Sequence, residues 1–146
     1  MSPECSICSF VATPPSGGWY IENEFWRVGP FLAPTLPGVV LVYLRRHAAG
    51  LSDMRPEELQ SLGPTLAAGT RAIERALQPE RVYSVMFGEQ IRHVHFVLMP
   101  RGKEVPVEHR SAALIVNQAY YMDPEAARQA IVRLREALAA EAVPRK

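Results

Sequence analysis

Residues 90–101 read QIRHVHFVLMPR, and the side chains of this run alternate in character. The two alternating sets are His93, His95 and Val97 on one parity, and Val94, Phe96 and Leu98 on the other. In a β-strand, residues of one parity point to the same face, with about 7 Å between successive members. The run therefore predicts a strand with two imidazoles on one face and an apolar face that packs on a core. These imidazoles can belong to a metal site, form a nucleophile with a helper, or serve one role each.

Size and charge limit the functional classes that remain. The 146 residues predict one domain, 1–146, with a substantial core. Sixteen basic and 15 acidic side chains give a net charge of +1, which favours neither nucleic acid nor an anionic membrane as a partner. No apolar run approaches the roughly 18 residues of a membrane span, and the N-terminus does not resemble a signal peptide. We therefore expect a cytoplasmic protein.

The remaining chain predicts an α+β domain. Strand character occurs over 19–28 as a hairpin, over 39–44 as a central strand, and over 81–87. Helical periodicity follows residue 56, interrupted at Gly63 and Pro64, so we expect one kinked helix or two short helices in line. Residues 113–121 are ambiguous between strand and helix, and a C-terminal helix is expected over about 124–141. Strands joined by hairpins, with separate helices, indicate a mainly antiparallel sheet.

The spacing Cys5-x-x-Cys8 is compatible with a metal site, a redox pair or two unligated cysteines. A redox pair is typically found at a helix N-terminus of a thioredoxin-like fold, and no βαβ pattern surrounds this one. A metal site needs two further ligands. His47 closes the predicted central strand and His93 begins the histidine strand, so Cys5, Cys8, His47 and His93 would form a tetrahedral Cys2His2 set if the strands are neighbours.

His93 and His95 are either two solvated polar residues or part of a catalytic site. A catalytic imidazole of this kind attacks phosphorus and carries a phosphoryl or nucleotidyl group on nitrogen. Such chemistry requires hydrogen-bond donors around the phosphate oxygens. Gln90, Arg92 and Arg101 are close in sequence and are candidates for that role.

Several segments together resemble the histidine triad family. Residues 93–101 are similar to its His-x-His-x-His motif, which is followed by apolar residues and often Pro-Arg. Cys5-x-x-Cys8 is similar to the N-terminal cysteine pair of many members, and residues 37–47 are similar to their Pro-Gly-His-x-Leu-Val-Ile-Pro-Lys-x-His segment. Residues 51–58 resemble the helix start that follows, and 87–92 the approach to the triad. The resemblance covers about residues 5–101.

The resemblance implies a fold, a chemistry and a cofactor. The fold is an α+β domain with a mainly antiparallel five-stranded sheet, a helix between the central strands and a C-terminal helix, and it pairs as a homodimer. The activity is hydrolysis or transfer at a nucleoside phosphate, with His95 as the nucleophile. Zinc-containing members, including the galactose-1-phosphate uridylyltransferase branch, place their ligands at positions that correspond to Cys5, Cys8, His47 and His93.

The chain departs from the family pattern at several positions that handle the substrate. Val97 stands at the third triad position, and its side chain cannot donate a hydrogen bond to phosphate. Val39 stands where a further histidine is common, and residues 31–34 lack the acidic residue that many members use to hold ribose hydroxyls. Gln90 replaces the serine or threonine often found three residues before the triad.

Three hypotheses follow from this pattern. In the first, the protein is a divergent phosphohydrolase or nucleotidyltransferase: His95 attacks phosphorus, Gln90 or Arg101 binds phosphate oxygens or the leaving group, and zinc is structural. In the second, it is a nucleotide-binding or scaffold protein of the same fold with weakened chemistry. In the third, zinc is catalytic and is bound by both His93 and His95, which leaves the cysteine pair without a role.

Overall fold

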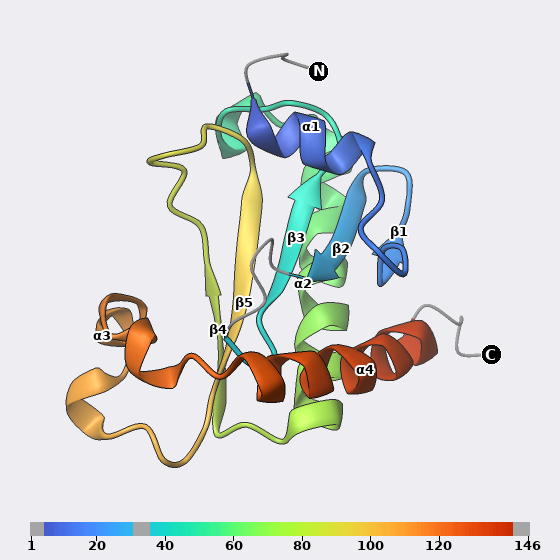
Figure 1. The fold of residues 1–146 in the computed structure, drawn as a ribbon. Helices are drawn as coiled ribbons and strands as arrows, with labels where there is room; N and C mark the ends of the chain where they lie inside the picture. Colours follow the sequence, from blue (N-terminus) through green and yellow to red (C-terminus); the bar gives the residue numbers. More distant parts are fainter. Residues whose placement is uncertain (1–4, 31–35, 142–146) are drawn as a thin grey trace.

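The computed structural model describes residues 5–30 and 36–141. Within them, five strands form one antiparallel sheet in the order β1-β2-β3-β5-β4 (Figure 1). The strands are β1 (Ile21–Glu22), β2 (Trp26–Pro30), β3 (Val40–Leu44), β4 (Arg81–Val85) and β5 (His95–Arg101). The predicted α+β class and the antiparallel five-stranded sheet are confirmed.

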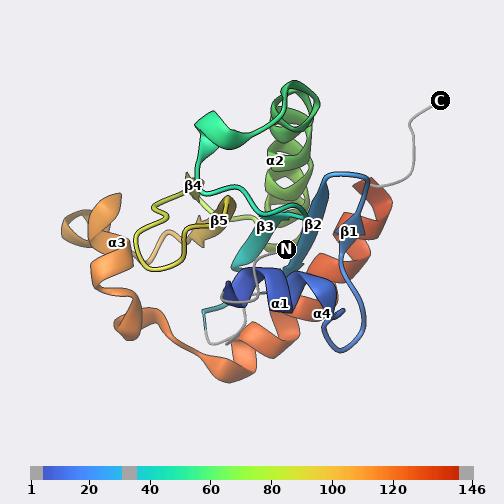
Figure 2. The same cartoon turned by 90° about the horizontal axis from the view of Figure 1, so that it is seen from above.

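The central strand β3 separates the two faces of the sheet. Its five side chains are all buried, as expected for a continuous apolar run covered on both sides. Val40, Val42 and Leu44 pack into the main core with side chains of α2 (Pro56–Leu77) and α4 (Pro124–Glu141), while Leu41 and Tyr43 pack under α1 (Ser6–Ala12). Figure 2 shows α1 and α2 on opposite sides of the sheet.

The expected helices are present, with clearer bounds than the sequence provides. Helix α2 is one continuous helix that carries Gly63 and Pro64 in its interior. A proline removes a single backbone hydrogen bond, so its effect stays local in a helix of 22 residues that packs closely against α4. The C-terminal helix α4 has the predicted bounds. The ambiguous segment is helical, as α3 (Ala112–Val116) and η3 (Gln118–Tyr121). The remaining short helices are η1 (Leu51–Asp53) and η2 (Val107–His109).

Two features differ from the sequence-based expectation. Helix α1 is not predicted, because it has only seven residues and its N-cap residue Cys5 makes no side-chain capping hydrogen bond. The histidine strand begins at His95 rather than His93, so the even alternation does not extend to His93. The backbone of Val94 explains this start, since its N–H donates to Ala48 O and its carbonyl accepts from Leu44 N–H. His93 therefore lies in the bend that leads into β5.

The described helices include none that is long and apolar enough to cross a membrane. Residues 31–34, where the sequence lacks the acidic residue expected for ribose binding, lie outside the described part of the chain.

Candidate metal centre and histidine strand

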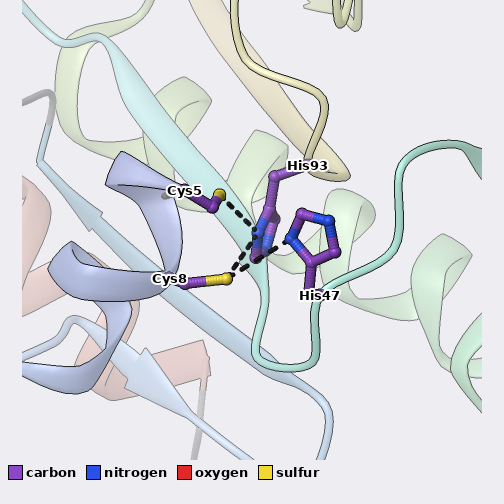
Figure 3. A group of neighbouring side chains, drawn as sticks. All are labelled: Cys5, Cys8, His47 and His93. Atoms are coloured by element: carbon purple, nitrogen blue, oxygen red, sulfur yellow. Dashed lines mark hydrogen bonds between the residues drawn. The ribbon is translucent and has the colours of Figure 1, made fainter. Parts of the chain in front are cut away.

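Cys5, Cys8, His47 and His93 come together from three distant parts of the chain. The two cysteines lie at the start of α1, His47 follows β3, and His93 precedes β5 (Figure 3). Their ligand atoms all lie within 4.8 Å of one another. The two cysteines are buried and form no disulfide, His93 is fully buried and His47 is half-buried. Together they form a closed group of four soft and borderline donors, which suits zinc.

Three of the distances between these donors match the edge of a tetrahedral metal site. Cys5 Sγ and Cys8 Sγ each lie 3.5 Å from His93 Nδ1, and Cys8 Sγ lies 3.4 Å from His47 Nδ1. With Zn–S bonds of ~2.3 Å and Zn–N bonds of ~2.0 Å, the S···N edge of a tetrahedron is ~3.5 Å. A single imidazole nitrogen that faces two sulfurs at equal distance is poorly explained by one hydrogen bond. The arrangement is one that could hold a shared metal ion.

His93 is held in the protonation state that a metal requires. Its Nε2 lies 2.7 Å from Leu44 O, and a carbonyl oxygen can only accept, so Nε2 carries the hydrogen. Nδ1 is then bare and faces the cysteines. Burial lowers the pKa of His93, which further favours the neutral ring. An imidazole that donates its second nitrogen to a backbone carbonyl is the usual outer-shell arrangement of a metal-binding histidine.

Arg46 links the segment that carries His47 to helix α2. Its guanidinium makes two hydrogen bonds to the Glu58 carboxylate, at 2.9 and 2.8 Å, and a third to His47 O at 3.0 Å. Glu58 also accepts from Arg55 N–H, which completes the N-terminal cap of α2. Hydrogen bonds from Arg46 lower the pKa of Glu58 against the opposing effect of burial. The backbone around His47 is thereby attached to a structured element.

His95 is half-buried at the start of β5 and is not one of the clustered donors. Its Nδ1 lies 2.6 Å from His93 O, so Nδ1 must carry the hydrogen and donate it. The lone pair of the neutral ring is then on Nε2. The structure therefore divides the two histidines: His93 faces the cysteines, and His95 retains a nitrogen with nucleophilic character.

The structure places the two candidate phosphate ligands very differently. Gln90 is exposed in the segment between β4 and β5, where it lines a shallow hollow beside Cys5 and His47. Arg101 is six residues beyond His95 on β5, about 20 Å away by strand geometry. It is buried, and its guanidinium donates to Gly102 O and lies by the Tyr83 hydroxyl. Arg101 is thus not brought to His95, although the two residues share a strand face.

The residues that orient the site were not found from the sequence. The carbonyl oxygens of Leu44 and His93 fix the two imidazoles, and backbone groups leave no signature in residue type. The sequence around the start of α2 indicates a capping role for Glu58, because this acidic residue stands three positions after the N-cap. The pattern does not reveal that the same carboxylate holds Arg46.

Solved structures with this architecture include histidine triad proteins. A zinc-bound histidine triad family protein from Mycobacterium smegmatis superposes with a TM-score of 0.71 at 21% identity, covering 94% of each chain. A HIT-like protein involved in cell-cycle regulation from Bartonella henselae gives a TM-score of 0.70 at 17% identity, over 94% of this chain and 98% of that one.

This chain has the histidine triad fold. A uridylyltransferase structure also matches, with a TM-score of 0.67 at 20% identity over 96% of this chain and 46% of its own length. By sequence, no protein-family model and no curated protein matches the chain. The similarity to these structures therefore concerns the histidine triad fold, and the chemistry has to be argued from the site itself.

Proposed function

We propose that this protein is a divergent histidine triad phosphohydrolase or nucleotidyltransferase in which His95 is the nucleophile. The hydrogen bond between His95 Nδ1 and His93 O, at 2.6 Å, carries the proposal. It fixes the tautomer, orients the ring and leaves the Nε2 lone pair available. In the neutral ring the other nitrogen carries no hydrogen, so a histidine nucleophile held in this way needs no separate base.

The reaction proceeds in two displacements. His95 Nε2 donates its lone pair to phosphorus while the bond from phosphorus to the leaving group breaks. The leaving group departs with that electron pair and takes a proton from solvent. Water, or the hydroxyl of a second acceptor, then attacks phosphorus and releases its proton to solvent, and the electron pair of the breaking P–N bond returns to Nε2, which restores neutral His95. His93 O supports the positive ring formed in the first step, since it accepts the Nδ1 hydrogen throughout.

Cys5, Cys8, His47 and His93 would hold a structural zinc ion. These residues would use the metal to join the start of α1 to the segment after β3 and to the bend before β5, and the ion would supply no chemistry to the reacting phosphorus. Because the carbonyl of His93 accepts the hydrogen bond that orients His95, a fixed His93 would also fix the proposed nucleophile. The catalytic-zinc hypothesis is disfavoured, since His95 is not among the clustered donors and its Nδ1 is occupied by His93 O.

We further infer a nucleoside phosphate or another small phosphate ester as the substrate. The exposed amide of Gln90 is the candidate donor to phosphate oxygens, with a place in the hollow beside the metal cluster. Arg101 can contribute at His95 only through a long-range charge effect, given their separation along β5. Two thiolates in a metal site suit a reducing compartment, which supports a cytoplasmic location.

The same proposal includes a homodimer. Strand β4 is at the edge of the sheet, where its outer backbone groups face no further strand of the described chain. Phe87 and Val116, in the segments that flank this edge, are 64% and 83% exposed. An unpaired edge beside exposed apolar side chains is a typical surface for pairing with a second copy. Sedimentation of the purified chain would detect the dimer.

Turnover of a substrate panel tests the enzymatic proposal. The panel comprises nucleoside monophosphate esters and nucleoside phosphoramidates, offered to the wild-type protein, to His95→Ala and to His109→Ala. His109 is the matched control because it is in η2, hydrogen-bonds to Tyr121 and is not one of the clustered donors. We expect turnover in the wild type and in His109→Ala, and its loss in His95→Ala. An absence of turnover across the panel would reject the enzyme.

The valine at position 97 supports one alternative to the enzyme, which is a nucleotide-binding or scaffold protein with weakened chemistry. At the third triad position, an isopropyl group can neither donate to phosphate nor protonate a leaving group. The alternative predicts that nucleoside phosphates bind without turnover. Equilibrium binding measured on the same panel separates it from the enzyme.

A further inference from the structure

A small cavity opens on the sheet face that carries His95. Its volume is about 130 Å³, and we call it the apolar slot. The slot is formed mainly by Val39, Val85, Phe87, Val97, Met99 and Ile115. Among the described residues that line it, Gln118 alone has a polar side chain. The residues come from β3, β4, β5 and α3 or their ends, so the walls are structured elements rather than one loop.

The slot begins next to the proposed nucleophile. His95, Val97 and Met99 have the same parity on β5 and therefore share a face, with about 7 Å between successive members. Val97 is both the residue adjacent to His95 on that face and a wall of the slot. A group bonded to phosphorus at His95 would have to extend along β5 toward Met99 to reach the slot.

Both valines that depart from the family pattern line this slot. Val97 occupies the third triad position and Val39 the position where a further histidine is common, and the two lie far apart in sequence. Each change removes a polar group, and the two together leave an apolar surface at one place.

We propose that the apolar slot receives an apolar substituent of the phosphorus substrate that His95 attacks. This inference rests on the proposed function and specifies its substrate class. Cavities of about 150 Å³ lined by apolar side chains accept one aromatic ring, so the substituent is an aryl group or a short branched alkyl group. The substrate class is a phosphate ester or phosphoramidate that carries such a group. A second charged or strongly hydrated group would lose its hydration there without compensation.

The slot can be tested without any reaction. Methyl resonances of the valine and isoleucine residues in the full chain are followed by NMR during titration with benzene. We expect shifts at Val39, Val97 and Ile115 and none at Val132, which is 60% exposed on α4. If benzene leaves the slot resonances unchanged, the proposal is overturned, whether the slot is inaccessible or is filled by a second copy of the chain.

A second titration connects the slot to His95. Phenylphosphonate should bind about tenfold more tightly than methylphosphonate, because only the phenyl ring fills the slot. Val97→Thr keeps the volume, adds a hydroxyl and should reduce this ratio severalfold, while Val132→Thr should leave it unchanged. Phe87→Ser should also reduce it, and since Phe87 is 64% exposed this substitution does not disturb the core.

The outcomes for the slot and for catalysis are distinct. His95→Ala removes the nucleophile but retains the slot, so the preference for phenylphosphonate should persist in that variant. Equal binding of the two phosphonates to the wild type would overturn the slot proposal, even if nucleotide esters are turned over. Preferential phenyl binding with no turnover of any ester would leave the slot in place and reject the proposed enzyme.

Discussion

His95 donates its Nδ1 hydrogen to the backbone carbonyl oxygen of His93, with 2.6 Å between Nδ1 and that oxygen. The same His93 directs its own Nδ1 at the two cysteines and its Nε2 hydrogen at Leu44 O. One short segment therefore links the proposed metal ligand His93 and the proposed nucleophile His95. This link predicts that metal content and chemistry respond differently to the loss of each histidine.

Substitution of the two histidines should separate the metal from the chemistry. We expect elemental analysis to find about one zinc per chain in the wild type and in His95→Ala. His93→Ala should contain little zinc, because it removes one of four ligands from a buried site. Equal zinc loss in both variants would instead support a metal bound by both histidines.

Removal of zinc should destabilise the fold around α1. With free zinc at about 100 times its Kd, binding to the folded state alone contributes about 3 kcal/mol to the free energy of unfolding. Chemical denaturation with and without a chelator measures this difference. Cys8→Ser, which loses a buried ligand, should show little response to the chelator. A wild type whose unfolding is unaffected by chelation would show that the four residues do not hold a stabilising metal.

The Arg46–Glu58 pair should make stability depend on acidity. The pKa of Glu58 is lowered in the folded protein by hydrogen bonds from Arg46, so the carboxylate contributes stability above its unfolded pKa. This contribution is lost as pH falls through the folded pKa. Glu58→Gln should lower the free energy of unfolding by about 1–3 kcal/mol near neutral pH. The free energy of unfolding is measured by denaturation at about pH 6 and at about pH 3, with chelator present throughout. Its decrease between the two pH values should be smaller for Glu58→Gln than for the wild type.

Much of the candidate site could be predicted because its residue types are rare and their spacing is informative. The chain has two cysteines and four histidines, so the set Cys5, Cys8, His47 and His93 follows from few combinations once the strands are assigned. The alternation of Phe96 and Leu98 against His95 and Val97 likewise identified the core face of β5.

The remaining features depend on contacts that residue types do not encode. The start of β5 at His95 depends on backbone bonds from Val94 to Ala48 and Leu44. Helix α1 is too short to have its own signal and is packed on Leu41 and Tyr43. The sequence predicts Arg101 as a candidate phosphate ligand because it is close to His95 along the chain, whereas the extended strand places it about 20 Å from His95.

A histidine at the third triad position should raise the rate of turnover. Val97→His places a proton donor next to His95, and the adjoining cavity of about 130 Å³ leaves room for the larger ring. We expect turnover of nucleoside phosphate esters to rise about tenfold or more, since positioned acid catalysis commonly contributes at least that much. Val97→Leu enlarges the side chain without a donor and should not raise turnover. Equal turnover in the two variants would show that the third position does not limit the rate.

Trapping of the covalent intermediate tests the central claim most directly. The protein is incubated briefly with a nucleoside phosphoramidate, quenched under alkaline conditions that preserve phosphorus–nitrogen bonds, and analysed by intact and peptide mass spectrometry. The account predicts a nucleotidyl adduct on His95 in the wild type and in His109→Ala, and none in His95→Ala. An adduct on another residue, or complete turnover with no adduct at His95, would contradict the assignment of His95 as the nucleophile.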